Sequence, residues 1–187
     1  IQDVFRYLAN DQGRTNAIAM EVKRAYEMGR KVLVLTERTD HLDGIKIALD
    51  GQVPAPFVLH GRMSKKQRAA LIAELEALPP DVPRVLLATG KLVGEGFDHP
   101  PLDTLVLAMP VSWKGTLQQY AGRLHRAHAI KTDVRIIDFV DAGHPALLRM
   151  WDKRQRGYRA MGYRIALDEG INDTATNLND SFWVGPR

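Results

Sequence analysis

Two arginines, Arg123 and Arg126, stand three positions apart in the segment TLQQYAGRLHRAH. On a helical wheel they share a narrow arc with Gln119 and Gly122, opposite an apolar side. An arginine side chain carries a planar fork of five donors that suits phosphate. For two arginines alone, the simpler interpretation is an amphipathic helix with a solvated basic face. Gly122 argues for close approach by a partner, because glycine inside a helix costs about 0.5–1 kcal/mol relative to alanine.

A second candidate is the segment LLATGKLVGEGFD, which follows a predicted strand. Thr89 and Gly90 fall at the strand end, where a hydroxyl and an accessible backbone N–H suit a phosphate. Gly96 and then Asp98 follow in the next turn. A glycine loop with a capping aspartate is the alternative. The segment is neither a P-loop nor a dinucleotide fingerprint, because the required Gly and Ser/Thr positions are not matched.

These residues need a scaffold, and the chain alternates apolar runs with helical patterns. Strands are predicted at residues 31–36, 56–60, 84–89, 103–110 and 133–141. Helices are predicted over 3–28 with a break near Asn10, from Thr39 or Asp40 to Leu49, after the capping box Ser64–Gln67, over 116–128, and over 145–161. This order predicts an α/β fold with a mainly parallel sheet and helices on both faces. Ligands of such sheets bind beyond the carboxyl ends of the strands.

The composition sets further bounds. The chain has 187 residues, a formal charge of +4, a pI near 9.4 and no cysteine. Disulfides and thiolate metal sites are therefore excluded, and no other metal site is predicted. No apolar run is long enough to span a membrane and no signal peptide is visible, so we expect a cytoplasmic protein without a membrane partner. The mild basicity permits an anionic partner.

Taken in order, the segments LTERTDH, LHGRMSKKQR, LLATGKLVGEGFD and QQYAGRLHR resemble motifs IV, IVa, V and VI of the second lobe of superfamily-two helicases. Within the DEAD/DEAH group, the forms QxxGRxxR and GEGFD look closest to restriction-enzyme ATPase subunits. The resemblance covers about residues 31–140. It implies a RecA-like three-layer α/β/α fold with helical extensions at both ends.

The resemblance also implies site residues. Arg123 and Arg126 match the arginine fingers, and Gly96, Asp98 and Gln119 match other positions that contact ATP. ATP and Mg²⁺ would be held mainly by the N-terminal lobe, the expected partner. Positions that match contacts with the nucleic-acid backbone are Thr36, Arg38, Gly61, Arg62, Thr89 and Gly90. Trp113 and Lys114 follow a strand end and are added as a stacking and phosphate-binding pair, although Trp113 also fits the edge of the core.

We therefore predict a helicase C-terminal domain over residues 1–165, with a helical lead-in at 1–30, a core at 31–141, a basic helix at 144–165 and a polar, loosely held tail at 166–187. No P-loop or Asp-Glu box precedes the motifs, so the chain is expected to hold half an ATP site and to be inactive alone. DNA is favoured over RNA. A non-catalytic nucleic-acid-binding lobe and a doubly wound domain for a small phosphorylated ligand remain alternatives.

Overall fold

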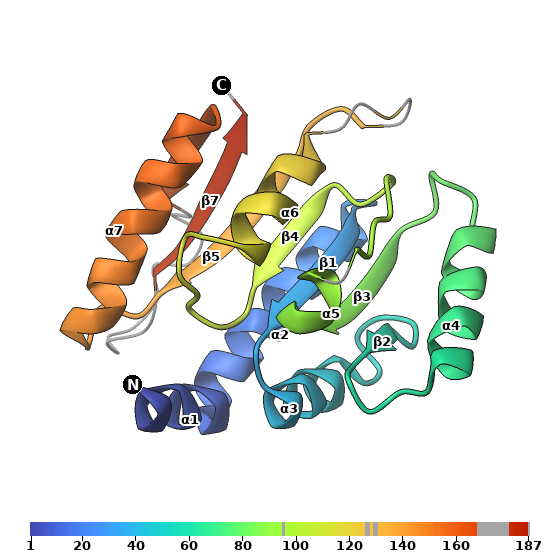
Figure 1. Ribbon diagram of the computed structural model, residues 1–187, viewed down its shortest axis with the longest axis horizontal. Coiled ribbons are helices and arrows are strands. Elements are labelled where there is room, and N and C mark those ends of the chain that lie inside the picture. The colour runs from blue at the N-terminus through green and yellow to red at the C-terminus, as the bar shows by residue number, and fades with distance from the viewer. Residues whose placement is uncertain (95, 126–127, 129–130, 168–179, 187) are drawn as a thin grey trace.

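The computed structural model describes residues 1–94, 96–125, 128, 131–167 and 180–186. Its strands are β1 Lys31–Thr36, β2 Phe57–Leu59, β3 Arg84–Thr89, β4 Thr104–Leu107, β5 Arg135–Val140, β6 Tyr163–Leu167 and β7 Asp180–Pro186. Its helices are α1 Gln2–Asn10, α2 Gln12–Glu27, α3 Thr39–Leu49, α4 Lys65–Ala77, α5 Gly90–Gly94, α6 Thr116–Leu124 and α7 Pro145–Ala160. Figure 1 shows these elements as a central sheet between helices.

The strands form one sheet in the order β2-β3-β1-β4-β5-β7-β6. The pairs β2–β3, β3–β1, β1–β4 and β4–β5 are parallel, and β7 is antiparallel to both β5 and β6. Because β1 and β3 pair in register from Lys31–Arg84 to Thr36–Thr89, their carboxyl ends lie side by side. The predicted mainly parallel α/β fold is confirmed.

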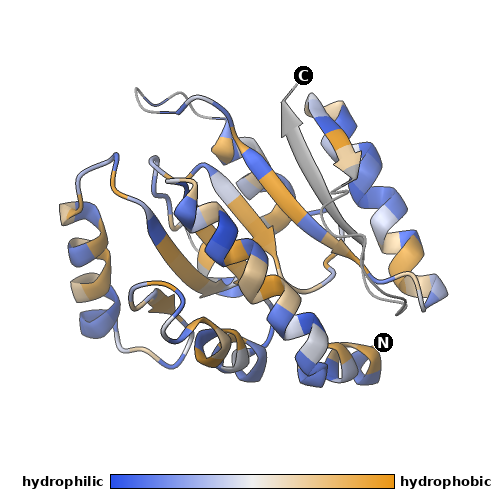
Figure 2. Ribbon diagram, turned by 180° about the vertical axis from the view of Figure 1, so that it is seen from behind, coloured by the Kyte–Doolittle hydropathy of each residue, from blue (hydrophilic) through white to orange (hydrophobic). Residues whose placement is uncertain are grey.

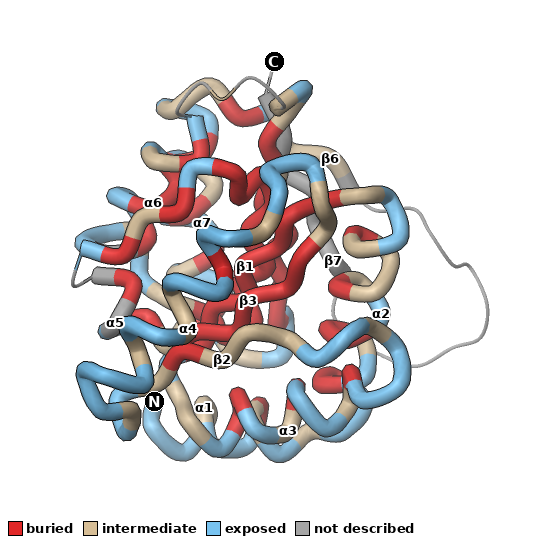
Figure 3. The backbone as a smooth tube through the Cα atoms, turned by 90° about the vertical axis from the view of Figure 1, so that its right-hand side faces the viewer, coloured by how far each residue is buried: buried red, intermediate tan, exposed pale blue. Residues whose placement is uncertain are grey.

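Alternate residues of the central strands point to opposite faces of the sheet, as the strand period requires. Leu33 and Leu35 of β1 join a cluster with residues from α4, α5, α6 and α7, whereas Val32 and Val34 join one with α2 and α3. Helices therefore cover both faces, and α2 comes to the front when the molecule is turned round (Figure 2). The central strands β1 and β3 are buried over nearly their whole length (Figure 3), which explains their continuous apolar sequences.

Several details differ from the prediction. Strands β2, β4 and β5 are shorter than predicted. Helix α3 begins after Arg38 without a side-chain cap, so neither Thr39 nor Asp40 is its cap. Within the tail predicted at 166–187, residues 180–186 form β7, which pairs along β5, whereas residues 168–179 and 187 lie outside the described residues. The segment SFWV within β7 has the aromatic and β-branched residues typical of strands, and β7 covers an edge of β5 that would otherwise be open.

Candidate ATP-facing and nucleic-acid-facing sites

Helix α6 carries the first candidate residues on one exposed side. Leu117, Tyr120 and Leu124 are buried against the sheet, as predicted, whereas Gln119 and Gly122 are exposed. Arg123 is half-buried beside them. Helix α6 ends at Leu124, earlier than predicted. The predicted finger Arg126 and the predicted apolar Ala127 lie outside the described residues.

The guanidinium of Arg123 joins the two motif-bearing segments. Its Nη1 donates a hydrogen bond of 2.7 Å to the backbone carbonyl of Phe97, between Gly96 and Asp98. Burial, followed by the negative charge of Asp98, raises the pKa of Tyr120, while the charge of Arg123 acts in the opposite direction. The structure thus brings Arg123 and Asp98 to one place, although 25 residues of sequence separate them.

The two glycines near Arg123 have different reasons to be glycine. Gly96 has a φ of +95°, a conformation that L side chains rarely adopt. At Gly122, an added Cβ would have no described atom within 4 Å beyond its own helix. Packing within this chain therefore does not require a glycine at position 122. That outcome fits a partner that approaches this face, which remains a prediction.

The carboxyl ends of β1 and β3 carry Thr36 and Thr89, which are register partners. The Thr36 side chain is fully buried, and its hydroxyl lies 3.0 Å from Nδ1 of His41. Thr89 is half-buried at the start of α5. The Thr36 hydroxyl therefore already has a hydrogen-bond partner inside the lobe, in His41.

Arg38 and Asp40 form a bidentate ion pair just after β1. The Arg38 Nε and Nη2 donate to the two Asp40 carboxylate oxygens at 3.0 and 2.8 Å. These hydrogen bonds hold the pKa of Asp40 below its usual value. The guanidinium of Arg38 can contact a phosphate only through donors that Asp40 does not use.

Glu37 is a residue of this edge that the sequence reading missed. Its carboxylate lies against Gly90 so closely that a Cβ there would collide with it. Desolvation raises the pKa of Glu37 above its usual value. Sequence offered no signal for this contact, because one acid after a strand resembles any other.

The loop between β2 and α4 presents Gly61 and Arg62 to solvent. The Arg62 backbone N–H donates to Nδ1 of His60 at 3.2 Å, and the predicted capping box of Ser64 and Gln67 starts α4. The Arg62 side chain is therefore exposed next to a well-defined helix start.

Residues 108–115 connect β4 to α6 and carry Trp113 and Lys114. The Trp113 ring meets Tyr158 edge-on at 5.0 Å and 81°, and it lies where Gly157 of α7 leaves room. This packing favours the core-edge alternative for Trp113, whereas Lys114 is exposed. The sequence reading did not anticipate the close contact at Gly157.

Two buried arginines fix this β4–α6 loop from opposite faces of the sheet. From α2, Arg14 donates to both carboxylate oxygens of Asp141, at 2.9 and 3.0 Å, and to the carbonyl of Ala108. From α7, Arg154 donates to the Asp138 carboxylate at 2.8 and 3.0 Å and to the carbonyl of Val111 at 3.0 Å. Single-sequence reasoning missed both, because buried arginines look like surface ones in sequence.

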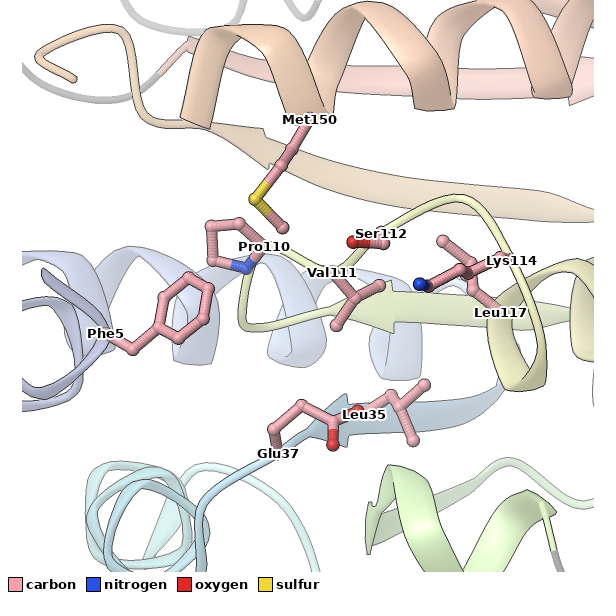
Figure 4. Close-up of a pocket in the computed structure, with 9 residues that line it drawn as sticks. All are labelled: Phe5, Leu35, Glu37, Pro110, Val111, Ser112, Lys114, Leu117 and Met150. Atoms are coloured by element: carbon pink, nitrogen blue, oxygen red, sulfur yellow. The ribbon is translucent and has the colours of Figure 1, made fainter. Parts of the chain in front are cut away.

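Beside the loop lies a hollow of about 270 Å³ at the carboxyl ends of β1 and β4 (Figure 4). Its apolar wall includes Phe5 of α1 and Met150 of α7. Glu37, Ser112 and Lys114 supply its polar groups. Within the described ranges, no three His, Asp or Glu residues gather as a metal site, and no helix could cross a membrane.

Comparison with known proteins shows which family the chain belongs to. Residues 15–128 match the family described as the helicase conserved C-terminal domain, which is more than half of the chain. The chain belongs to this helicase C-terminal domain family. The predicted identity as a helicase C-terminal lobe is therefore confirmed, while the predicted closeness to restriction-enzyme ATPases stays a prediction.

Two sequence relatives are viral. The chain is 35% identical over 101 residues to uncharacterized protein 108L of Invertebrate iridescent virus 3, a match that covers 54% of this chain and 90% of that protein. It is 26% identical over 137 residues to the probable helicase D10 of Escherichia phage T5, covering 73% of this chain but 30% of D10. The chain thus spans less than a third of the length of D10.

Solved structures support the RecA-like fold. T4 UvsW superposes with a TM-score of 0.65 at 19% identity, covering 86% of this chain and 35% of UvsW. The C-terminal domain of the DEAD-box protein Dbp5 gives a TM-score of 0.58 at 17% identity and covers 78% of each chain. Both likenesses concern the fold.

Proposed function

We propose that this helicase C-terminal domain is the second lobe of an ATP-driven helicase or translocase on nucleic acid, with DNA favoured over RNA. In this proposal an N-terminal lobe completes the ATP site, and Arg123 and Arg126 act as its arginine fingers. The observation that carries the proposal is the bond from Arg123 to the Phe97 carbonyl. It fixes a guanidinium beside Asp98, on the same side of α6 as the exposed Gln119.

The residues on this side of α6 fit part of a site for ATP with Mg²⁺. Arg123 uses one N–H donor in its hydrogen bond to Phe97, and its other donors can bind a phosphate. Gln119 can form a hydrogen bond with a polar group of the nucleotide. ATP would supply the phosphoryl group that is transferred to water. The chain's own contribution is positive charge held in place before the reaction, and an arginine finger is worth roughly 10³–10⁵ in rate.

The same proposal assigns the nucleic-acid backbone to the carboxyl ends of the strands. Thr89, Gly61 and Arg62 lie there at least partly exposed, and Lys114 adds a positive charge. Thr36 instead supports this edge from within through His41. Trp113 is left out, since its ring is packed against α7.

Substitution of Arg123 in a protein that carries both lobes tests the ATP-site proposal. Arg123→Ala should lower nucleic-acid-stimulated ATP hydrolysis by about 10³-fold or more, while ATP affinity changes only a few-fold. Arg149→Ala is a matched control, because Arg149 is an exposed arginine on α7. A melting curve checks that loss of the Phe97 bond has not unfolded α6. Wild-type hydrolysis by a folded Arg123→Ala protein would contradict the finger assignment.

A second candidate function deserves its own test. The match to protein 108L spans 90% of that relative, so a protein of about one lobe exists among the relatives. A lobe of this kind could bind nucleic acid without catalysis. Both readings predict no ATP hydrolysis by the 187-residue chain alone. Mixing it with a candidate N-terminal lobe separates them, since only a true second lobe restores hydrolysis.

A further inference from the structure

The hollow at the carboxyl ends of β1 and β4 is not used by the ATP-site proposal. Phe5, Val111, Leu117 and Met150 form most of its wall, and four different segments contribute them. In Figure 4 Phe5 and Met150 lie on one side of Val111 and Leu117 lies on the other, while Glu37 borders the set from the β1 side. Such a wall suits a flat aromatic ring, and the half-buried Phe5 supplies an aromatic side chain for it to pack against.

Two opposite charges border the hollow without pairing with each other. Among the described residues, neither the Glu37 carboxylate nor the Lys114 ammonium makes a hydrogen bond or ion pair. An arginine or lysine side chain as ligand would meet repulsion from Lys114, and a carboxylate would meet repulsion from Glu37. The hollow therefore favours a neutral ring with N–H donors on one edge and acceptors on another.

We propose that this hollow binds an unstacked guanine base of the strand held by the lobe, an inference that rests on the nucleic-acid function proposed above. Guanine offers two adjacent donors, N1–H and the 2-amino group, to the Glu37 carboxylate, and its O6 and N7 can accept from Lys114. Adenine and cytosine offer one amino group without an adjacent ring N–H, and thymine offers the single N3–H, so none of them presents two adjacent donors.

The location supports a base over a free small molecule. The Glu37 carboxylate touches Gly90, next to Thr89, so the hollow adjoins the edge assigned to the phosphate backbone. The β4–α6 loop, which supplies Val111 and Lys114, is fixed by hydrogen bonds from buried arginines to the carbonyls of Ala108 and Val111. A wall fixed in this way is already formed before a base binds. Binding therefore costs little conformational entropy of the loop.

The test is binding of fluorescent twelve-nucleotide DNA strands to the chain. One strand is all thymidine, a second carries three separated guanines, and a third carries inosine at the same places, which removes only the 2-amino group. We expect the guanine strand to bind about tenfold more tightly than the thymidine strand, with inosine between them. Glu37→Gln should abolish the difference between guanine and inosine.

Matched variants separate the hollow from the fold. Glu76→Gln removes an exposed carboxylate on α4, outside the hollow, and should leave the guanine preference unchanged. Phe5→Ala should weaken the guanine strand by about tenfold while the thymidine strand changes little. Equal binding of guanine and thymidine strands, or a preference for guanine over inosine that survives Glu37→Gln, overturns the guanine site alone. Absence of salt-dependent binding to every strand overturns the nucleic-acid function as well.

Discussion

Removal of the Arg154 guanidinium should be among the most destabilising single changes in this lobe. Arg154 and Asp138 are both almost fully buried, at 1% and 0% exposure. Asp138 accepts two hydrogen bonds from Arg154 and a third from the Tyr158 hydroxyl, at 2.9 Å. Arg154→Met keeps the apolar stem but leaves the Asp138 charge with only the Tyr158 hydroxyl.

The expected cost follows from that geometry. Breaking a buried ion pair by removing one partner costs about 3–5 kcal/mol, because the remaining charge is desolvated and uncompensated. The Val111 carbonyl loses its donor as well. For a domain of this length the cost corresponds to a fall in melting temperature of roughly 6–20 °C. It is a large share of a typical free energy of unfolding of about 5–15 kcal/mol.

Urea unfolding of the chain, followed by circular dichroism, measures this cost. Adding Asp138→Asn to Arg154→Met removes the orphaned charge and should restore about 2 kcal/mol, because Tyr158 can still donate to the amide oxygen. Arg38→Met is the control, since Arg38 and Asp40 make a similar pair at the surface. It should leave the urea midpoint almost unchanged, because solvent screens a surface pair.

The reasoning is refuted by a small effect. A loss below about 1 kcal/mol for Arg154→Met would mean that water or rearrangement compensates the Asp138 charge. A double variant less stable than the single one would show that the charge of Asp138 is not the source of the cost.

Three further predictions concern packing, pH and capping. Gly157→Ala should destabilise the lobe by about 1–3 kcal/mol or more in urea unfolding, since the new methyl group would collide with the Trp113 ring; an unchanged midpoint would show that the ring moves freely. Burial lowers the pKa of His41 and of His99 from 6.5 to about 4. As pH falls, the two histidines are therefore protonated in the unfolded chain before they are protonated in the folded one. Their contribution to the free energy of unfolding is complete above pH 6.5 and is lost as pH falls toward 4. Replacement of His99 by Gln should flatten that decline in urea midpoints, and an equally steep decline would count against it. Ser64→Ala should cost about 0.5–2 kcal/mol through loss of the α4 cap, measured by the same unfolding, whereas no change would mean that α4 frays in both proteins.

Local patterns in the sequence are sufficient to predict much of the fold. The strands at residues 31–36 and 84–89 were predicted with the bounds that the structure has, because central parallel strands are apolar on both faces and end abruptly at polar residues. The start of α4 was equally plain from Ser64 and Gln67, since a capping box is a local contact. These features need only neighbouring residues to be recognised.

The site was predicted less completely because its contacts join distant residues. Periodicity placed Arg123 on the exposed side of α6, yet nothing in the sequence indicated that it donates to Phe97. Glu37 and Gly90 meet only because β1 and β3 are neighbours in the sheet. Strand order decides such contacts, and a single sequence does not state strand order.

The buried arginines Arg14 and Arg154 link the strands of the fold to the position of the candidate site. Arg14 on the α2 face and Arg154 on the α7 face donate to carbonyls three residues apart in the β4–α6 loop, at Ala108 and Val111. Their carboxylate partners, Asp141 and Asp138, lie three residues apart at the end of β5. The loop is thus tied to β5 from both faces of the sheet. Because α6 begins directly after this loop, the two ion pairs set where α6 starts and hence where Arg123 lies. Weakening either pair should therefore lower ATP hydrolysis by the proposed two-lobe protein before it unfolds the lobe, which parallel hydrolysis and urea-unfolding measurements would show.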